Sequence, residues 1–118
     1  MRLVNLLPKL KNRTKENMTL WKNSVMTSFF HTQGSEDTPC VVKIDDQQIL
    51  IEYSEEEEGR DILKQYCGAN DGTGHFTLDM NHNGLSGRAT LHMFPGATLL
   101  VGNWVEGSIR GTWSILLG

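Results

Sequence analysis

The side chains that could do chemistry are few in this chain of 118 residues. The four histidines, His31, His75, His82 and His92, lack the H-x-H or H-E-x-x-H spacing of metal sites. We expect His75 and His92 on an outer sheet face but not on one cross-strand row, so all four are interpreted as surface histidines. No G-x-S-x-G, phosphate-binding loop or dinucleotide fingerprint occurs. The sequence therefore indicates no catalytic constellation, and no cofactor is predicted.

The segment Asp79–Gly84 matches the opening of the calcium-loop pattern D-x-[DN]-x-[DN]-G. The twelfth position of such a loop should be a bidentate glutamate, and here it is Thr90. The flanking residues also have the pattern of strands rather than helices. We therefore predict a hairpin turn at this segment and no metal site.

Three polar residues, Arg88, Asn103 and Arg110, are expected with Thr77 in one outward row across four adjacent strands. Two guanidinium groups around an amide could bind a carboxylate or phosphate bidentately, which makes this row a candidate anion site. The alternative is a row of solvated residues, with Asp79 pairing diagonally with Arg88. An enzyme that uses this row is the least favoured of the functions considered.

These residues require strands to position them, and the C-terminal half predicts an antiparallel meander. Apolar and polar residues alternate with period two, which is typical of half-buried strands. The strands are expected over residues 74–80, 85–94, 98–105 and 108–117. Turn residues between them predict a register that pairs Met80 with Leu85, Leu91 with Leu100 and Trp104 with Ile109. This register keeps the apolar side chains on one face.

The inner face of this meander combines small residues with indoles. Its centre is expected to hold Gly87, Ala89, Gly102 and Gly111. If the indoles lie over the glycines, the core is filled. Otherwise a cavity remains, lined by Phe76, Leu91, Met93, Leu100, Trp104 and Trp113. Small barrels hold ligands in apolar pockets of this kind, so a carrier of a small apolar ligand is one functional hypothesis.

The last two strands each contain a Gly-x-Trp motif, Gly102-Asn103-Trp104 and Gly111-Thr112-Trp113. This is similar to the G-x-W motif of the lipocalin-like, or calycin, barrels, which carry it near the start of the barrel. The likeness covers six residues and implies a similar barrel architecture by analogy rather than membership of that family.

The first half of the chain is less regular. Residues 40–53 predict a hairpin, and residues 61–68 fit a strand or a short helix, with the strand favoured. Apolar residues recur at helical spacing between Met18 and Phe29, which predicts an amphipathic helix over 13–30. The alternative is a hairpin that turns at Lys22-Asn23. The expected organisation is one domain, with a basic helical segment over 1–35 packed on a meander over 40–117. The meander is expected to form a small antiparallel barrel or strongly curved sheet of about seven strands.

Charge is unevenly distributed along the chain. Residues 1–26 carry a net charge of +5 and the remainder –8, which gives –3 overall. The acidic run over 55–58 is interpreted as a solvated turn, with a weak cation or basic-partner site as the alternative. A net negative charge disfavours nucleic-acid binding, except through the basic N-terminal segment.

The N-terminal stretch fits a secretory signal poorly, because Pro8 and Lys9 interrupt its short apolar run. No apolar run approaches the roughly 20 residues of a membrane-spanning helix. We therefore expect a cytoplasmic protein, and whether Cys40 and Cys67 pair is left open. The leading functional hypothesis is a non-enzymatic binding or interaction module that binds a protein partner or associates with itself.

Overall fold

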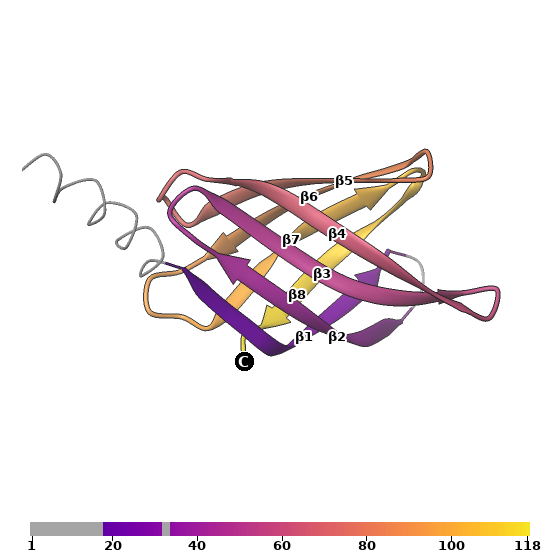
Figure 1. The fold of residues 1–118 in the computed structure, drawn as a ribbon, viewed down its shortest axis with the longest axis horizontal. Helices are drawn as coiled ribbons and strands as arrows, with labels where there is room; N and C mark the ends of the chain where they lie inside the picture. The colour runs from indigo at the N-terminus through magenta and orange to yellow at the C-terminus, as the bar shows by residue number, and fades with distance from the viewer. Residues whose placement is uncertain (1–17, 32–33) are drawn as a thin grey trace, which may run out of the picture.

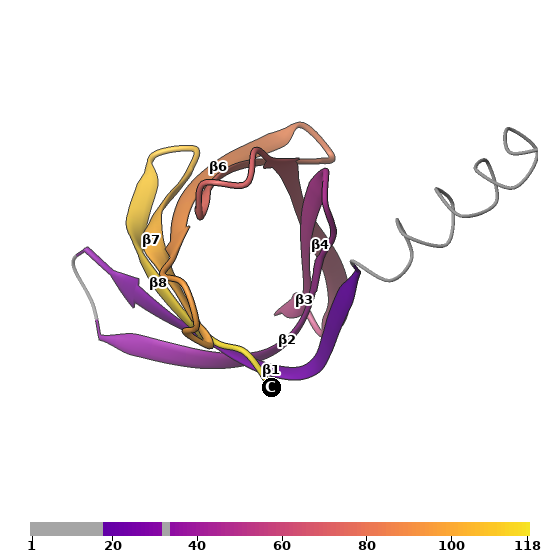
Figure 2. The ribbon, with the colours of Figure 1, turned by 90° about the vertical axis from the view of Figure 1, so that its left-hand side faces the viewer.

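The computed structural model describes residues 18–31 and 34–118, which form a closed antiparallel barrel. Eight strands follow one another around the barrel in chain order, and the last pairs with the first (Figures 1 and 2). The strands are β1 Thr19–Phe30, β2 Ser35–Ile44, β3 Gln48–Glu57, β4 Arg60–Asn70, β5 His75–His82, β6 Leu85–Met93, β7 Leu99–Glu106 and β8 Ile109–Leu116. The predicted meander barrel is therefore confirmed, with eight strands rather than about seven. Within the described ranges, no helix is long and apolar enough to cross a membrane.

Alternation along the strands separates the interior from the surface, as the sequence predicts. In β5, Phe76, Leu78 and Met80 are buried, and the residues between them are exposed. In β6, Ala89 and Leu91 are buried in the same way. Because successive side chains of a strand point to opposite faces, this pattern places one apolar set inside the barrel.

The predicted faces of the C-terminal hairpins are correct, but the predicted register is wrong by two residues in each. The observed partners are Met80 with Gly87, Met93 with Leu100 and Trp104 with Gly111. The β5–β6 turn is tight because Asn83 and Gly84 both adopt positive φ, 49° and 84°. In this hairpin the pairing extends to His82 and Leu85, closer to the turn than expected. A shift of two residues leaves every side chain on its predicted face.

Strand β1 replaces the helix predicted from the N-terminal apolar pattern, and this prediction is wrong over the described residues. Val25 and Phe29, two residues of the helically spaced pattern, point outward and are 40% and 46% exposed, whereas Met26 and Ser28 are buried. β1 pairs with both β2 and β8 and so closes the sheet, which leaves neither edge of the barrel unpaired. Residues 1–17, the remainder of the predicted basic segment, lie outside the described residues.

The other uncertain segments of the first half are also strands. The predicted 40–53 hairpin is formed by β2 and β3, which extend beyond those residues. The strand over 61–68 is confirmed as part of β4. Cys40 is buried and Cys67 is exposed, and both are free thiols. Burial raises the pKa of the Cys40 thiol to about 11.

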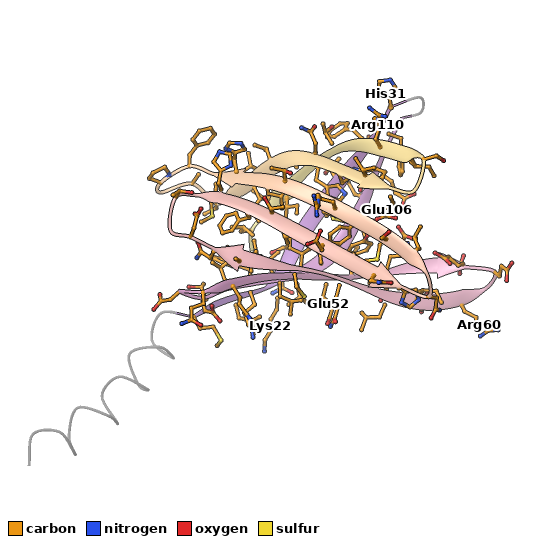
Figure 3. All side chains as sticks on the ribbon, turned by 90° about the horizontal axis from the view of Figure 1, so that it is seen from above. Lys22, His31, Glu52, Arg60, Glu106 and Arg110 are labelled. Carbon is orange, nitrogen blue, oxygen red and sulfur yellow. The ribbon has the colours of Figure 1, made fainter. Side chains whose placement is uncertain are left out.

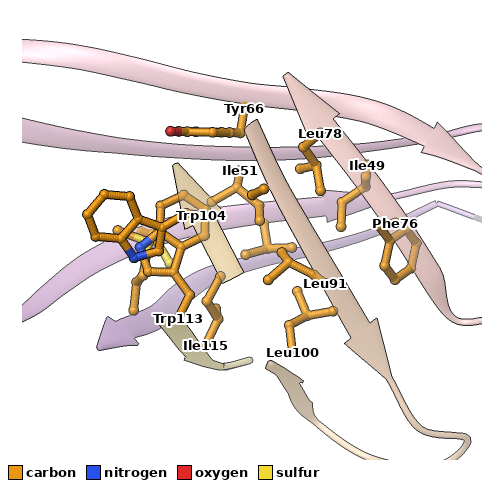
Figure 4. Close-up of a cluster of buried hydrophobic side chains, with 14 of the residues drawn as sticks. Ile49, Ile51, Tyr66, Phe76, Leu78, Leu91, Leu100, Trp104, Trp113 and Ile115 are labelled. Atoms are coloured by element: carbon orange, nitrogen blue, oxygen red, sulfur yellow. The ribbon is translucent and has the colours of Figure 1, made fainter. Parts of the chain in front are cut away.

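The barrel interior has two unlike halves along its length. Toward the β2–β3 and β4–β5 turns it is filled by aliphatic side chains and Phe76, and the side chains of Ile49, Leu91 and Leu100 are fully buried. Toward the other end lie the aromatic rings of Trp104, Trp113 and Tyr66. Figure 4 shows the two indoles and the Tyr66 hydroxyl on one side of the cluster, with Ile49 and Phe76 on the other. The second half positions the site described next.

Candidate ligand-binding site

A pocket of about 340 Å³ occupies the end of the barrel where β1, β3 and β7 end and β2, β4, β6 and β8 begin. Every strand except β5 contributes to its lining. The lining residues are Met26, Ser28, Phe30, Glu36, Thr38, Tyr53, Glu55, Glu57, Lys64, Leu85, Trp104, Glu106, Ile109 and Trp113. Its volume falls in the range of small-molecule sites, about 300 to 1,000 Å³.

Two indoles form the aromatic wall of the pocket and are held in place by hydrogen bonds. Trp113 Nε1 donates to Ser28 Oγ at 3.0 Å, and Trp104 Nε1 donates to the Thr112 carbonyl at 3.2 Å. The two ring systems lie 6.1 Å apart with an interplanar angle of 30°. Gly111 leaves room for the Trp104 ring, since a Cβ there would come within 2.8 Å of the indole. Trp104 therefore lies over this glycine, while a pocket remains beside it, so the two alternatives considered from the sequence are not exclusive.

The opposite wall of the pocket is ionic and centres on Lys64 of β4. The Lys64 side chain is only 3% exposed, and its Nζ lies 2.7 Å from Glu55, 3.5 Å from Glu57 and 3.6 Å from Glu106. Burial lowers the pKa of Lys64, but the hydrogen bond to Glu55 and the surrounding carboxylates raise it overall, so the amine stays charged. With Glu36, four carboxylates and one ammonium line the pocket, and negative charge is in excess.

Glu106 is the most enclosed of the three carboxylates that pair with Lys64, with its side chain 15% exposed. Its Oε2 accepts hydrogen bonds from Tyr66 Oη at 2.5 Å and from Tyr53 Oη at 3.4 Å. Burial and the Glu106 charge raise the pKa of both tyrosines, so both hydroxyls remain donors. Gly87 makes this arrangement possible, because a Cβ there would overlap the Tyr66 hydroxyl and crowd Glu106 Cγ.

The structure divides the residues predicted to line an apolar cavity. Trp104 and Trp113 line the pocket. Phe76, Leu91 and Leu100 belong to the filled half, and Met93 packs against that core. The six residues therefore do not share one cavity.

The sequence interpretation missed Glu36, Lys64 and Glu106 of the pocket, and it kept a cation site at the acidic run over 55–58 only as its alternative. Glu55 and Glu57 belong to β3 and face the pocket, and only Glu58 and Gly59 of this region form the turn. The interpretation of the whole acidic run as a solvated turn is therefore wrong. A signal was present, since Glu55 and Glu57 continue the inward phase set by Tyr53.

The predicted outer row is also rearranged by the register shift. Arg88 and Arg110 share one row with Val105 between them, and Asn103 lies in the neighbouring row. Arg88 is directly opposite Asp79 rather than diagonal to it, and Arg88 Nε lies 3.0 Å from its carboxylate. The two guanidinium groups therefore do not flank the amide as expected.

The Asp79–Gly84 segment forms the end of β5 and a hairpin turn, as the sequence predicts. Within residues 18–31 and 34–118, no three histidine, cysteine or carboxylate side chains are grouped so that they could hold a metal ion. His75 and His92 depart from expectation, because they lie directly opposite each other on β5 and β6.

Comparison with known proteins finds no matching family model, no matching curated protein and no matching solved structure.

Proposed function

We propose that this barrel is a non-enzymatic binding protein for a small organic cation with an aromatic or apolar body. The observation that carries the proposal is the pocket of about 340 Å³, in which carboxylates outnumber the single ammonium beside a wall of two indoles. Such a ligand would place its ring against Trp104 and Trp113 and its charged nitrogen toward Glu57 and Glu106.

The side chains that line the pocket favour binding of a cationic ligand over an anionic one. An ammonium near an indole face gains about 0.5 to 2 kcal/mol from the ring quadrupole, depending on its desolvation. Lys64 is already paired at 2.7 Å with Glu55, while Glu57 and Glu106 lie 3.5 and 3.6 Å from its Nζ. A ligand cation can therefore approach these two carboxylates without replacing the shortest ion pair.

The pocket is held in place by contacts between its own residues. Both indole N–H groups and both tyrosine hydroxyls have hydrogen-bond acceptors within the barrel. A wall fixed in this way loses little conformational entropy when a ligand enters, which favours binding. By contrast, Leu91 and Leu100 are fully buried, so the aliphatic half of the barrel supports an apolar carrier less well.

Binding can be tested by titrating the full chain with phenethylamine and with phenethyl alcohol, its neutral analogue of similar shape, by calorimetry. We expect the amine to bind about tenfold more tightly, the scale of one partly desolvated cation–π contact. Equal affinity for both compounds would instead favour a carrier of neutral apolar ligands. Binding of neither would remove the proposal for this ligand class.

A matched pair of variants locates the bound cation. Glu57 faces the pocket, whereas Glu56 beside it on β3 is exposed and does not line it. We expect Glu57→Gln to weaken amine binding about twofold to fivefold, as for a partly exposed ion pair. Glu56→Gln changes the net charge equally and should leave binding unchanged.

A protein-interaction role is the second candidate, favoured by an apolar row on the outer surface. Val25, Leu116 and Leu99 are cross-strand neighbours on β1, β8 and β7, and they are 40%, 57% and 39% exposed. Contiguous exposed apolar residues of this kind are typical of contact surfaces. Sedimentation of the wild-type chain and Leu116→Lys tests self-association: we expect a concentration-dependent dimer that the variant loses.

A further inference from the structure

The two histidines at the far end of the β5–β6 hairpin form a close pair. His75 and His92 are direct cross-strand partners, and their ring centroids lie 3.7 Å apart with an interplanar angle of 61°. Met93 N–H donates to the Gly74 carbonyl at 2.8 Å, which fixes the hairpin backbone beside the pair. Both side chains are on the outer surface, where His75 is exposed and His92 half-buried.

We propose that His75 and His92 form a two-ligand site for a divalent transition-metal ion, with Cu²⁺ bound most tightly. Imidazole is a preferred ligand of copper, nickel and zinc, and affinity among divalent ions peaks at copper. Two metal–nitrogen bonds of about 2.0 to 2.1 Å to one ion require nitrogens about 3 Å apart. The ring centroids lie 3.7 Å apart, and to bind one ion both rings would turn a nitrogen toward it and move slightly apart. Water would fill the remaining coordination positions.

The surroundings of the pair favour a bound cation. The outward neighbours on the adjoining strand positions, Thr77, Thr90 and Val101, carry no charge. Asp71 lies in the β4–β5 turn, and its pKa is lowered chiefly by two hydrogen bonds that Thr73 donates to its carboxylate, with a smaller contribution from the charge of His75. A metal ion at the pair would therefore meet negative rather than positive potential.

The site is independent of the ligand pocket. It lies where β5 begins and β6 ends, whereas the pocket occupies the end where β6 begins. A metal ion held by both rings would link the two strands of the hairpin. Because the ion binds the folded arrangement, it should raise the melting temperature of the protein.

The test uses the full chain without a histidine tag, titrated with CuCl₂ and followed by electron paramagnetic resonance and thermal melting. We expect one tightly bound Cu²⁺ with two imidazole nitrogens and a metal-dependent rise in melting temperature. His75→Gln and His92→Gln should each weaken binding by about tenfold or more, since even the loss of an outer-shell partner costs that much. Both should also remove the rise in melting temperature.

His82→Gln is the matched control, since His82 is in the same hairpin but contacts Asn83 rather than another histidine. It should bind Cu²⁺ like the wild type. Melting of each metal-free variant verifies that the fold is kept. The proposal is overturned if the wild-type chain binds no Cu²⁺, if its spectrum shows a single imidazole, or if His82→Gln is the variant that loses binding.

Discussion

The Tyr66 hydroxyl donates a hydrogen bond to Glu106 Oε2 at 2.5 Å, which connects β4 to β7 through the barrel interior. These strands are not sheet neighbours, so the contact spans the barrel rather than joining adjacent strands. It holds a carboxylate at the base of the pocket, within 3.6 Å of Lys64. Figure 3 shows Glu106 near the end of the barrel that carries the long β3–β4 hairpin.

Removal of the Tyr66 hydroxyl should destabilise the protein. We expect Tyr66→Phe to lower the free energy of unfolding by about 2 kcal/mol, because hydrogen bonds to charged groups contribute about 1.5 to 3 kcal/mol. Tyr53→Phe is the matched comparison, since its bond to the same oxygen is 3.4 Å long and should contribute less. Urea unfolding of both variants measures the difference, and an equal or larger loss in Tyr53→Phe would contradict this ranking.

Gly87 should tolerate no side chain while Tyr66 keeps its hydroxyl. A methyl group at this position would overlap Tyr66 Oη, so Gly87→Ala should cost about 2 kcal/mol of stability by overpacking. In the Tyr66→Phe background the obstructing oxygen is absent, and the cost of Gly87→Ala should be smaller. Gly34→Ala is the control, because a Cβ there meets no atom of the described part of the chain within 4 Å. Additive losses in the double variant would show that the two residues do not interact.

Lys64 should stabilise the folded barrel because its charge partly neutralises three neighbouring carboxylates. Lys64→Met retains much of the aliphatic stem but leaves Glu55, Glu57 and Glu106 without their shared cation. We expect a loss of about 3 kcal/mol, the scale on which removal of one member of a buried ion pair destabilises a protein. Lys43→Met, on the outer side of β2, should change stability by less than about 0.5 kcal/mol. Similar unfolding midpoints for the two variants would contradict this role.

The tyrosines should make the protein sensitive to alkaline pH. Tyr53 and Tyr66 are the two tyrosines of the chain, and the pKa of each is raised above its ordinary value of 10. The unfolded chain therefore loses these protons first. Their contribution to stability is intact below pH 10 and falls as the pH rises above it toward the folded-state values.

This pH dependence can be followed by tyrosinate absorbance together with urea unfolding at increasing pH. We expect little tyrosinate at pH 10 in the folded protein, and ionisation that coincides with unfolding. Half-ionised tyrosines in a fully folded barrel at that pH would contradict the buried, Glu106-bonded arrangement.

The sequence predicts the faces of the strands far better than their register. Period-two alternation places Phe76, Leu78 and Met80 inside, and burial in the barrel agrees. Register depends on where each turn closes, and the positive φ at both Asn83 and Gly84 makes the β5–β6 turn shorter than expected. Residues 19–30 were wrongly predicted as a helix because their apolar residues also fit helical spacing. Pairing with β2 and β8 decides the structure there, and such long-range contacts override local propensity.

The sequence predicted the aromatic wall of the candidate site but not its ionic wall. Trp104 and Trp113 were predicted to line a cavity because glycines surround them on the inner face, and both line the pocket. In the ionic wall, Glu55 and Lys64 are neighbours across the β3–β4 hairpin, whereas Glu106 comes from β7 and meets them only when the barrel closes. The individual charges are ordinary in sequence, so their grouping could not be inferred without the correct register.

The most direct test of ligand binding is a proton–nitrogen correlation spectrum of the indole N–H groups during titration with phenethylamine. The chain contains three tryptophans, of which Trp104 and Trp113 line the pocket while Trp21 does not and serves as an internal reference. We expect saturable shifts of the Trp104 and Trp113 signals, with the Trp21 signal unmoved and much weaker shifts with phenethyl alcohol. Unchanged Trp104 and Trp113 signals at high amine concentration, or equal movement of all three, would contradict binding of an organic cation in the pocket.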